Sequence, residues 1–197
     1  LFYLMMIGEI PEKDDVINIS KDWATRAHVP KHVFDVIDAL PKNSRPMTQF
    51  SCAILSMAYD SVFQKAYRAG VNKKYYWDFM YEDVMTLVAR LPRIAAYIYR
   101  MKYFGETKKL KYNSKQDYGT NFARMMKVDN KKGYAELARL YFILHSDHES
   151  GNASAHAMHL AGSTLSDAFY AFSAALNALA GPLHGLANQE CLGWILE

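Results

Sequence analysis

The chain has few cysteines and no long apolar run, and each absence excludes a class of protein. Only Cys52 and Cys191 occur among 197 residues. Two cysteines so far apart form neither a disulfide framework nor a cysteine metal cluster, which favours a reducing compartment. No run of about 18 apolar residues exists, which argues against a membrane-spanning helix. The net charge of only +3, from 23 basic and 20 acidic residues, gives no indication of nucleic-acid binding.

Sustained alternation of polar and apolar residues is also lacking, and so are internal repeats, which argues against β-strands and solenoids. The 51% of hydrophobic residues suffices for one large core. We therefore predict an all-α, multi-helix globule of roughly ten helices. The expected helices are 11–28, 31–40, 47–59, 60–69, 75–91, a helix carrying Ile94, Ile98 and Met101 after an interruption at Pro92, then 117–127, 131–144, 153–161, 168–180 and 186–196.

The two ends of the sequence indicate a piece of a longer polypeptide. Leu1 is not an initiator methionine, and Trp194 to Glu197 stop inside a helical pattern without a capping glycine or proline. We expect N-terminal and C-terminal portions to be missing. The alanine-rich segment 168–180 predicts close helix packing, either within one protomer or between protomers.

The stretch 181–190 holds a histidine next to a helix start. Gly181 and Pro182 end the preceding helical run, and Gly185 frees the backbone beside His184. The N–H groups and macrodipole of a helix N-terminus favour a neutral imidazole, which can donate a hydrogen bond to a carbonyl. The alternative interpretation is an ordinary capping histidine in a turn.

Four more histidines lie upstream, at 145, 148, 156 and 159. One interpretation is a metal site, but no HExxH pattern and no cysteine supports it. A second is a carboxylate-binding pocket in which His148 donates to an anionic substrate while Ser154 and Asn152 orient neighbouring groups. The third is structural, with the remaining histidines hydrogen-bonded within or at the margin of helices. The metal hypothesis uses His145, His148, Glu149 and His156, and the structural one applies to His145, His156 and His159.

One cluster of lysines has two possible interpretations. Lys108, Lys109 and Lys111 lie in the long polar connection 102–115, where they could contact phosphate or belong to a solvated surface loop.

Three segments carry a resemblance to a known family. GPLHGLANQE at 181–190 resembles the signature around the first active-site histidine of citrate synthases, and ILHSDHESGNASAH at 143–156 and the opening LFYL with IGEIP after it are similar to further family segments. The similarity runs end to end. It implies an almost wholly helical homodimer with a large and a small domain, in which residues 1–197 form mainly the large helical domain of a catalytic chain.

The resemblance also implies roles for individual residues. His184 would hydrogen-bond the thioester carbonyl of acetyl-CoA, and His148 would contact oxaloacetate. Ser154, with Asn152, would orient the catalytic histidine. Lys73 and Lys74 occupy a region where family members present an arginine toward the phosphates of CoA, so this chain departs from the family there. The second histidine, the aspartate base and the carboxylate-binding arginines are expected beyond Glu197, so the fragment alone should be inactive.

The implied activity is that of an acyltransferase that condenses acetyl-CoA with oxaloacetate and water to give citrate and CoA, feeding the tricarboxylic acid cycle. The alternatives are a methylcitrate synthase that uses propionyl-CoA, and a non-catalytic assembly protein on the same scaffold. We expect no metal and no tightly bound cofactor, with acetyl-CoA as co-substrate. We also expect no nucleic-acid or membrane partner, a homodimer formed through helices including 166–180, and, from the closest family type, the mitochondrial matrix.

Overall fold

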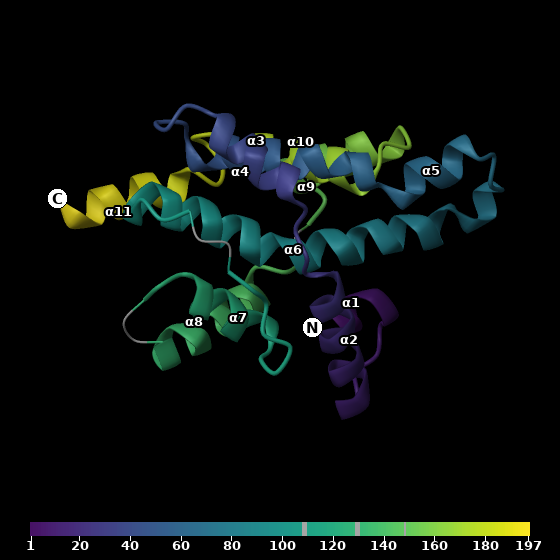
Figure 1. Ribbon diagram of the computed structural model, residues 1–197, viewed down its shortest axis with the longest axis horizontal. Coiled ribbons are helices and arrows are strands. Elements are labelled where there is room, and N and C mark those ends of the chain that lie inside the picture. The colour runs from purple at the N-terminus through teal and green to yellow at the C-terminus, as the bar shows by residue number, and fades with distance from the viewer. Residues whose placement is uncertain (108–109, 129–130, 148) are drawn as a thin grey trace. The chain divides into compact units, whose positions relative to one another are not determined.

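The computed structural model describes residues 1–107, 110–128, 131–147 and 149–197, and in these ranges the protein is helical without β-strands (Figure 1). The all-α prediction is confirmed. None of the described helices is long and apolar enough to cross a membrane. The helices are α1 (Phe2–Ile7), α2 (Lys13–Arg26), α3 (Lys31–Ala39), α4 (Pro46–Ser56), the 3-10 turn η1 (Met57–Asp60), α5 (Val62–Arg68), the 3-10 turn η2 (Lys73–Tyr75), α6 (Tyr76–Phe104), α7 (Tyr118–Met125), α8 (Lys131–Leu144), α9 (Ala153–Ser163), α10 (Ala168–Leu179) and α11 (Ala187–Leu196).

The chain divides into two compact units. Unit 1 consists of Leu1–Pro30 and Met85–His148, and unit 2 of Lys31–Val84 and Glu149–Glu197. Helix α6 runs through the boundary between residues 84 and 85 as one continuous helix (Figure 1).

Side-chain caps set where several helices begin. The carboxylate of Asp167 accepts hydrogen bonds from the backbone N–H groups of Phe169 and Tyr170, both at 3.0 Å, and is the N-cap of α10. Asp117 caps α7 in the same way, and Asn152 caps α9. These short polar residues satisfy N–H groups that have no partner within the helix.

Helix α5 begins two residues later than predicted, because Met57–Asp60 forms a 3-10 turn and Ser61 is the N-cap. Asp83 supports this start from α6. Its carboxylate accepts hydrogen bonds from the Ser61 hydroxyl at 2.6 Å and from the N–H groups of Val62 and Phe63 at 2.8 and 3.2 Å. Burial raises the pKa of Asp83, while these hydrogen bonds lower it, and the net direction is upward. A buried acid therefore fixes the start of a short helix.

In unit 2, α10 packs against α4 and α9, while α4 also contacts α3. Small residues on α10 allow this close approach, since Ala168, Ala171 and Ala175 are all buried. Where α4 and α10 meet, the hydroxyls of Ser51 and Ser173 are 2.8 Å apart and pair with each other. The alanine-rich segment is thus used for packing within the chain.

In unit 1, rings from four helices form a continuous aromatic row. Phe2 contacts Trp23, Trp23 contacts Tyr118, and Phe142 contacts both Tyr118 and Phe122, with centroid distances from 5.1 to 5.6 Å. The row connects α1, α2, α7 and α8 by side-chain packing.

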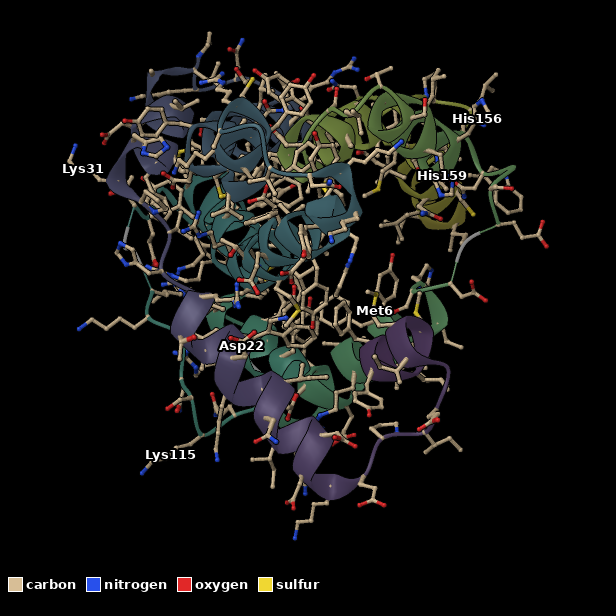
Figure 2. The ribbon with its side chains drawn as sticks, turned by 90° about the vertical axis from the view of Figure 1, so that its right-hand side faces the viewer. Met6, Asp22, Lys31, Lys115, His156 and His159 are labelled. Carbon is tan, nitrogen blue, oxygen red and sulfur yellow. The ribbon has the colours of Figure 1, made fainter. Side chains whose placement is uncertain are left out.

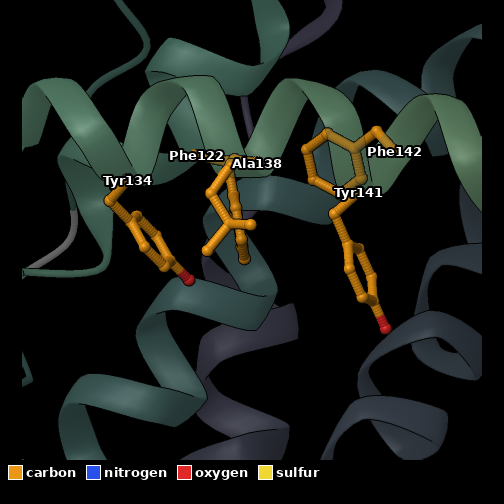
Figure 3. A pocket seen from close by; sticks show the side chains of 6 residues that line it. Phe122, Tyr134, Ala138, Tyr141 and Phe142 are labelled. Atoms are coloured by element: carbon orange, nitrogen blue, oxygen red, sulfur yellow. The ribbon is translucent and has the colours of Figure 1, made fainter.

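Helices α7 and α8 approach each other closely because Gly119 lacks a side chain. A Cβ atom at Gly119 would lie 2.9 Å from Cγ of Arg139 on α8. Between the two helices an apolar hollow of about 260 Å³ remains, lined by four aromatic residues together with Leu137 and Ala138 (Figure 3).

The predicted interruption at Pro92 is wrong, because α6 continues through it from Tyr76 to Phe104. Proline lacks the N–H that would normally donate to the carbonyl four residues earlier, that of Val88. The Tyr118 hydroxyl donates to this carbonyl instead, at 2.9 Å. Burial raises the pKa of Tyr118, so the hydroxyl keeps the proton it donates. A residue from α7 thereby satisfies the acceptor that proline leaves unpaired.

We expect Tyr118→Phe to lower the free energy of unfolding by about 1–3 kcal/mol, because the Val88 carbonyl loses its donor. In a Pro92→Ala background the same substitution should cost less, since the new N–H at position 92 can reach Val88. Urea unfolding of the four proteins of this double-mutant cycle measures both effects. Equal costs in the two backgrounds would contradict this account of the proline.

A second prediction concerns acid stability. Burial alone would raise the pKa of Asp117, but the Arg139 guanidinium and Thr120 outweigh it and lower this pKa from 3.8 to about 2. An acid with a lowered pKa in the folded state adds stability above pH 3.8, and this contribution is lost as the pH falls toward about 2. Asp117→Asn keeps an N-cap oxygen but loses the charge.

The parent protein should therefore exceed Asp117→Asn in thermal midpoint at pH 6, and the gap should narrow between pH 4 and pH 2. A gap that is independent of pH would mean that the ion pair with Arg139 makes no contribution.

Candidate active site around His184

His184 lies in a tight turn between α10 and α11. Its backbone N–H donates to the Gly181 carbonyl at 3.0 Å, and its own carbonyl accepts from the N–H of Ala187 at 3.1 Å. The N–H of Leu186 also donates to Gly181, at 3.3 Å. The backbone is therefore hydrogen-bonded on both sides of the histidine, which holds its Cα in place.

The turn requires glycine at position 185 because there is no room for a side chain. A Cβ atom there would lie 2.5 Å from the carbonyl oxygen of Leu179 and 2.6 Å from its Cδ1 atom. The sequence predicted that this glycine gives conformational freedom, but Gly185 is not among the glycines with positive φ. Its function is to let the turn pack directly against the end of α10.

The His184 imidazole reaches the N-terminus of α9. Its Nε2 atom is 2.9 Å from the Ser154 hydroxyl and 3.3 Å from the Ser154 backbone nitrogen. Ser154 is the second residue of α9. From the sequence we expected His184 to lie at the N-terminus of the helix that follows it, α11. The N–H group that contacts its ring belongs instead to α9, thirty residues upstream.

Asn152 completes a short polar chain. As the N-cap of α9, its Oδ1 atom accepts hydrogen bonds from the N–H groups of Ser154 and Ala155, at 3.2 and 3.4 Å. The same oxygen is 2.8 Å from the Ser154 hydroxyl. Three of the four predicted site residues are thus connected: Ser154 is within hydrogen-bonding distance of both His184 and Asn152.

The hydrogen bonds assign a tautomer to His184. A backbone N–H can only donate, so the bond from Ser154 requires Nε2 to be an acceptor. An imidazole that accepts at Nε2 carries its proton on Nδ1, so the backbone N–H of Ser154 favours this tautomer. The sequence predicted that Ser154 orients the catalytic histidine, but it did not identify the backbone N–H as the donor. The Asn-x-Ser spacing of a helix N-cap is the sequence signal that points to it.

The fourth predicted residue, His148, lies outside the described residues. The neighbouring His145 is at the end of α8, where its Nδ1 atom is 2.9 Å from the Tyr141 carbonyl and its ring stacks on Tyr141 at 3.9 Å. This arrangement is the helix-margin bonding of the structural interpretation. His156 and His159 are exposed on the outer side of α9 (Figure 2).

Among the described residues, no group of three or more histidine, cysteine, aspartate or glutamate side chains could hold a metal ion. Lys108 and Lys109 of the predicted phosphate patch lie outside the described residues. Lys73 and Lys74 are exposed in η2, and the Lys74 ammonium lies 4.7 Å from the centre of the Tyr75 ring.

Several arginines bond within unit 1. Arg93 donates to the carbonyls of Ala27 and Leu110, both at 2.8 Å. Arg100 pairs with Glu106, and Arg139 pairs with Asp117. Their hydrogen bonds hold loops and helices of the chain together.

Comparisons with known proteins identify the family of the chain. The sequence model of the family described as "Citrate synthase, C-terminal domain" matches residues 1–197. Citrate synthase 4, mitochondrial, of Arabidopsis thaliana is 50% identical over 99% of this chain and 41% of its own length. The mitochondrial citrate synthase of Emericella nidulans is 47% identical over 100% of this chain and 41% of its own. The chain therefore spans about two fifths of these relatives.

Solved structures give the same result. The crystal structure of citrate synthase from Pyrobaculum aerophilum superposes with a TM-score of 0.82 at 29% identity, over 95% of this chain and 46% of that one. Together with the family match over every residue, this similarity shows that the chain belongs to the citrate synthase family.

Proposed function

We propose that the protein carrying this chain is a citrate synthase, an acyltransferase that condenses acetyl-CoA with oxaloacetate and water to give citrate and CoA. The proposal rests on the contact between His184 and Ser154 in a chain that belongs to the citrate synthase family. Its Nε2 atom accepts from the backbone N–H of Ser154, which leaves the Nδ1 proton available for a substrate.

The chemistry requires such a donor. The methyl group of a thioester is a very weak acid, and when a base removes its proton, negative charge develops on the thioester oxygen. A preorganised hydrogen-bond donor stabilises this charge in the transition state. In the proposal, the Nδ1–H group of His184 donates to the thioester oxygen, while His148 contacts oxaloacetate. The base, the second histidine and the substrate-binding arginines belong to other parts of the protein.

Ser154 and Asn152 control the proton on His184. The Ser154 hydroxyl has one proton and two acceptors, Nε2 of His184 at 2.9 Å and Oδ1 of Asn152 at 2.8 Å. If the hydroxyl donates to His184, it supports the Nδ1–H tautomer; if it donates to Asn152, its oxygen can accept from a protonated Nε2. The backbone N–H of Ser154 favours the first arrangement, and it cannot reverse its direction.

Assembly and location follow from the family. The relatives are named as mitochondrial enzymes, and we propose the mitochondrion, specifically its matrix, for this protein. We also propose a homodimer through helices including 166–180. The buried face of α10 packs on α4 and α9, so the residues available for this interface are the exposed ones, such as Tyr170. Acetyl-CoA is proposed as a co-substrate, with no tightly bound cofactor.

Two other functions fit the same scaffold. A methylcitrate synthase would turn over propionyl-CoA faster than acetyl-CoA, so the ratio of the two rates distinguishes it. A non-catalytic assembly protein would bind no oxaloacetate, which calorimetry detects. The contacts of His184 with Ser154 favour an enzyme, because an assembly protein has no need for a histidine with a free donor.

We expect His184→Ala in the complete protein to lower kcat by about 10²–10³-fold or more, because the donor to the thioester oxygen is lost. Circular dichroism should show an unchanged fold. His156→Ala is the matched control, since this histidine is exposed on α9, and it should retain the parental rate. Near-parental turnover of His184→Ala would contradict the assigned function.

Ser154→Ala removes the hydroxyl but keeps the backbone N–H. We therefore expect the Nδ1–H tautomer to persist in ¹⁵N spectra of histidine-labelled protein, and kcat to fall about fivefold to tenfold, as for the loss of one hydrogen bond. KM for oxaloacetate should change little. A switch of His184 to the Nε2–H tautomer would show that the hydroxyl, and not the backbone, decides the tautomer.

A further inference from the structure

Leu179, the last residue of α10, lies directly behind the turn that carries His184. A Cβ atom at Gly185 would lie 2.5 Å from the Leu179 carbonyl oxygen, and 2.6 and 2.8 Å from Cδ1 and Cγ of its side chain. Since a Cβ is about 1.5 Å from its Cα, the Cα of Gly185 is within about 4.5 Å of all three atoms. The Leu179 side chain and the Gly185 backbone are therefore in van der Waals contact.

The outer side of this turn is exposed. Pro182 and Leu183 both face solvent in the part of the chain that the structure describes, and the Leu183 side chain is 100% exposed. The hydrogen bonds that the Gly181 carbonyl accepts come from residues of the turn itself, so they set its shape. How closely the turn approaches the end of α10 is set by the contact with Leu179.

The imidazole has little tolerance for a shift of the turn. Nε2 of His184 is 2.9 Å from the Ser154 hydroxyl and 3.3 Å from the Ser154 nitrogen. At about 3.6 Å such a contact is no longer a hydrogen bond, so a movement of about 0.3 Å away from α9 would end the longer one. Leu179 and Ser154 belong to α10 and α9, which pack against each other. The support behind the turn and the N–H group in front of it are therefore fixed relative to one another.

We propose that Leu179 is a positioning residue for His184. Its side chain sets how closely the turn approaches the end of α10, and this keeps Nε2 within reach of the Ser154 N–H. A shorter side chain leaves a space beside Gly185 into which the turn relaxes, and the Nδ1–H tautomer is then less favoured. The effect on turnover rests on the proposed function, whereas the effect on the imidazole does not.

The test compares two leucine-to-alanine changes on α10 in the complete protein. Leu179→Ala removes the side chain that contacts Gly185. Leu176→Ala is the matched control, since Leu176 lies one helical turn earlier, is 4% exposed and is not among the nearest neighbours of Gly185. The cavity in Leu176→Ala should lower the thermal midpoint at least as much, because Leu179 is only partly buried. A general loss of stability would thus affect the control as strongly.

We expect Leu179→Ala to lower kcat about tenfold with little change in KM for oxaloacetate, and Leu176→Ala to keep kcat within about twofold of the parent. In ¹⁵N spectra of histidine-labelled protein, the resonances that His184→Ala removes identify the imidazole. In Leu179→Ala alone they should move toward a mixture of the Nδ1–H and Nε2–H forms. Leu179→Met, which nearly conserves volume, should restore both the rate and the spectrum.

A double variant tests the contact itself. Gly185→Ala places a methyl group against Leu179 and should lower kcat. In Gly185→Ala/Leu179→Ala the new methyl group occupies part of the space that the leucine side chain leaves. The two losses in kcat should therefore combine to less than their product. Recovery should be incomplete, because the carbonyl oxygen at position 179 remains 2.5 Å from the added carbon.

The inference is overturned if Leu179→Ala keeps the parental kcat and imidazole spectrum, or if Leu176→Ala changes that spectrum equally. Should Leu179→Ala not fold, Leu179→Val should give the same changes at smaller size, and a parental spectrum for Leu179→Val overturns the inference as well. A parent protein without citrate synthase activity would contradict the proposed function alone, because the imidazole spectrum still tests Leu179.

Discussion

The candidate active site depends on one hydrogen bond, from the backbone N–H of Ser154 to Nε2 of His184. Side chains that contact a histidine can often donate or accept, and the tautomer then remains open. A backbone N–H has a fixed direction, and here it belongs to the first turn of a helix, where N–H groups have no partner within the helix. The fold thereby favours Nδ1 as the nitrogen of His184 that carries the proton.

That hydrogen bond requires α9 and the His184 turn to meet, and α10 holds them together. Asp167 begins α10, whose alanines pack against α4 and α9. At the other end of α10, Gly185 packs against the Leu179 carbonyl, so the turn follows the helix end closely. The small residues of α10 and its turn therefore contribute to the position of the imidazole as directly as Ser154 does.

The sequence predicts features that depend on neighbouring residues and misses those that depend on distant ones. The caps at Asp117 and Asp167 depend on a short polar side chain next to N–H groups two or three residues away. The predicted start of α10 at residue 168 is confirmed, and α7 begins at Tyr118, one residue after its predicted start. We predicted a helix break at Pro92 because the donor that replaces its missing N–H, the Tyr118 hydroxyl, comes from another helix and contacts the Val88 carbonyl. Likewise, the contact between Ser154 and His184 spans thirty residues, and only the family resemblance, not local spacing, suggested it.

Two buried acids in unit 2, Asp83 and Asp167, differ in how many of their oxygens accept hydrogen bonds. Asp83 and Asp167 each satisfy the first N–H groups of a helix, α5 and α10, and burial raises the pKa of both. Asp83 uses both oxygens, since Ser61, Val62 and Phe63 all donate to it. Asp167 performs the same capping with one oxygen only. Capping accounts fully for Asp83 but leaves the second oxygen of Asp167 without a structural reason. Since an asparagine would cap α10 equally well without a buried carboxyl group, the second oxygen of Asp167 adds nothing to the cap itself.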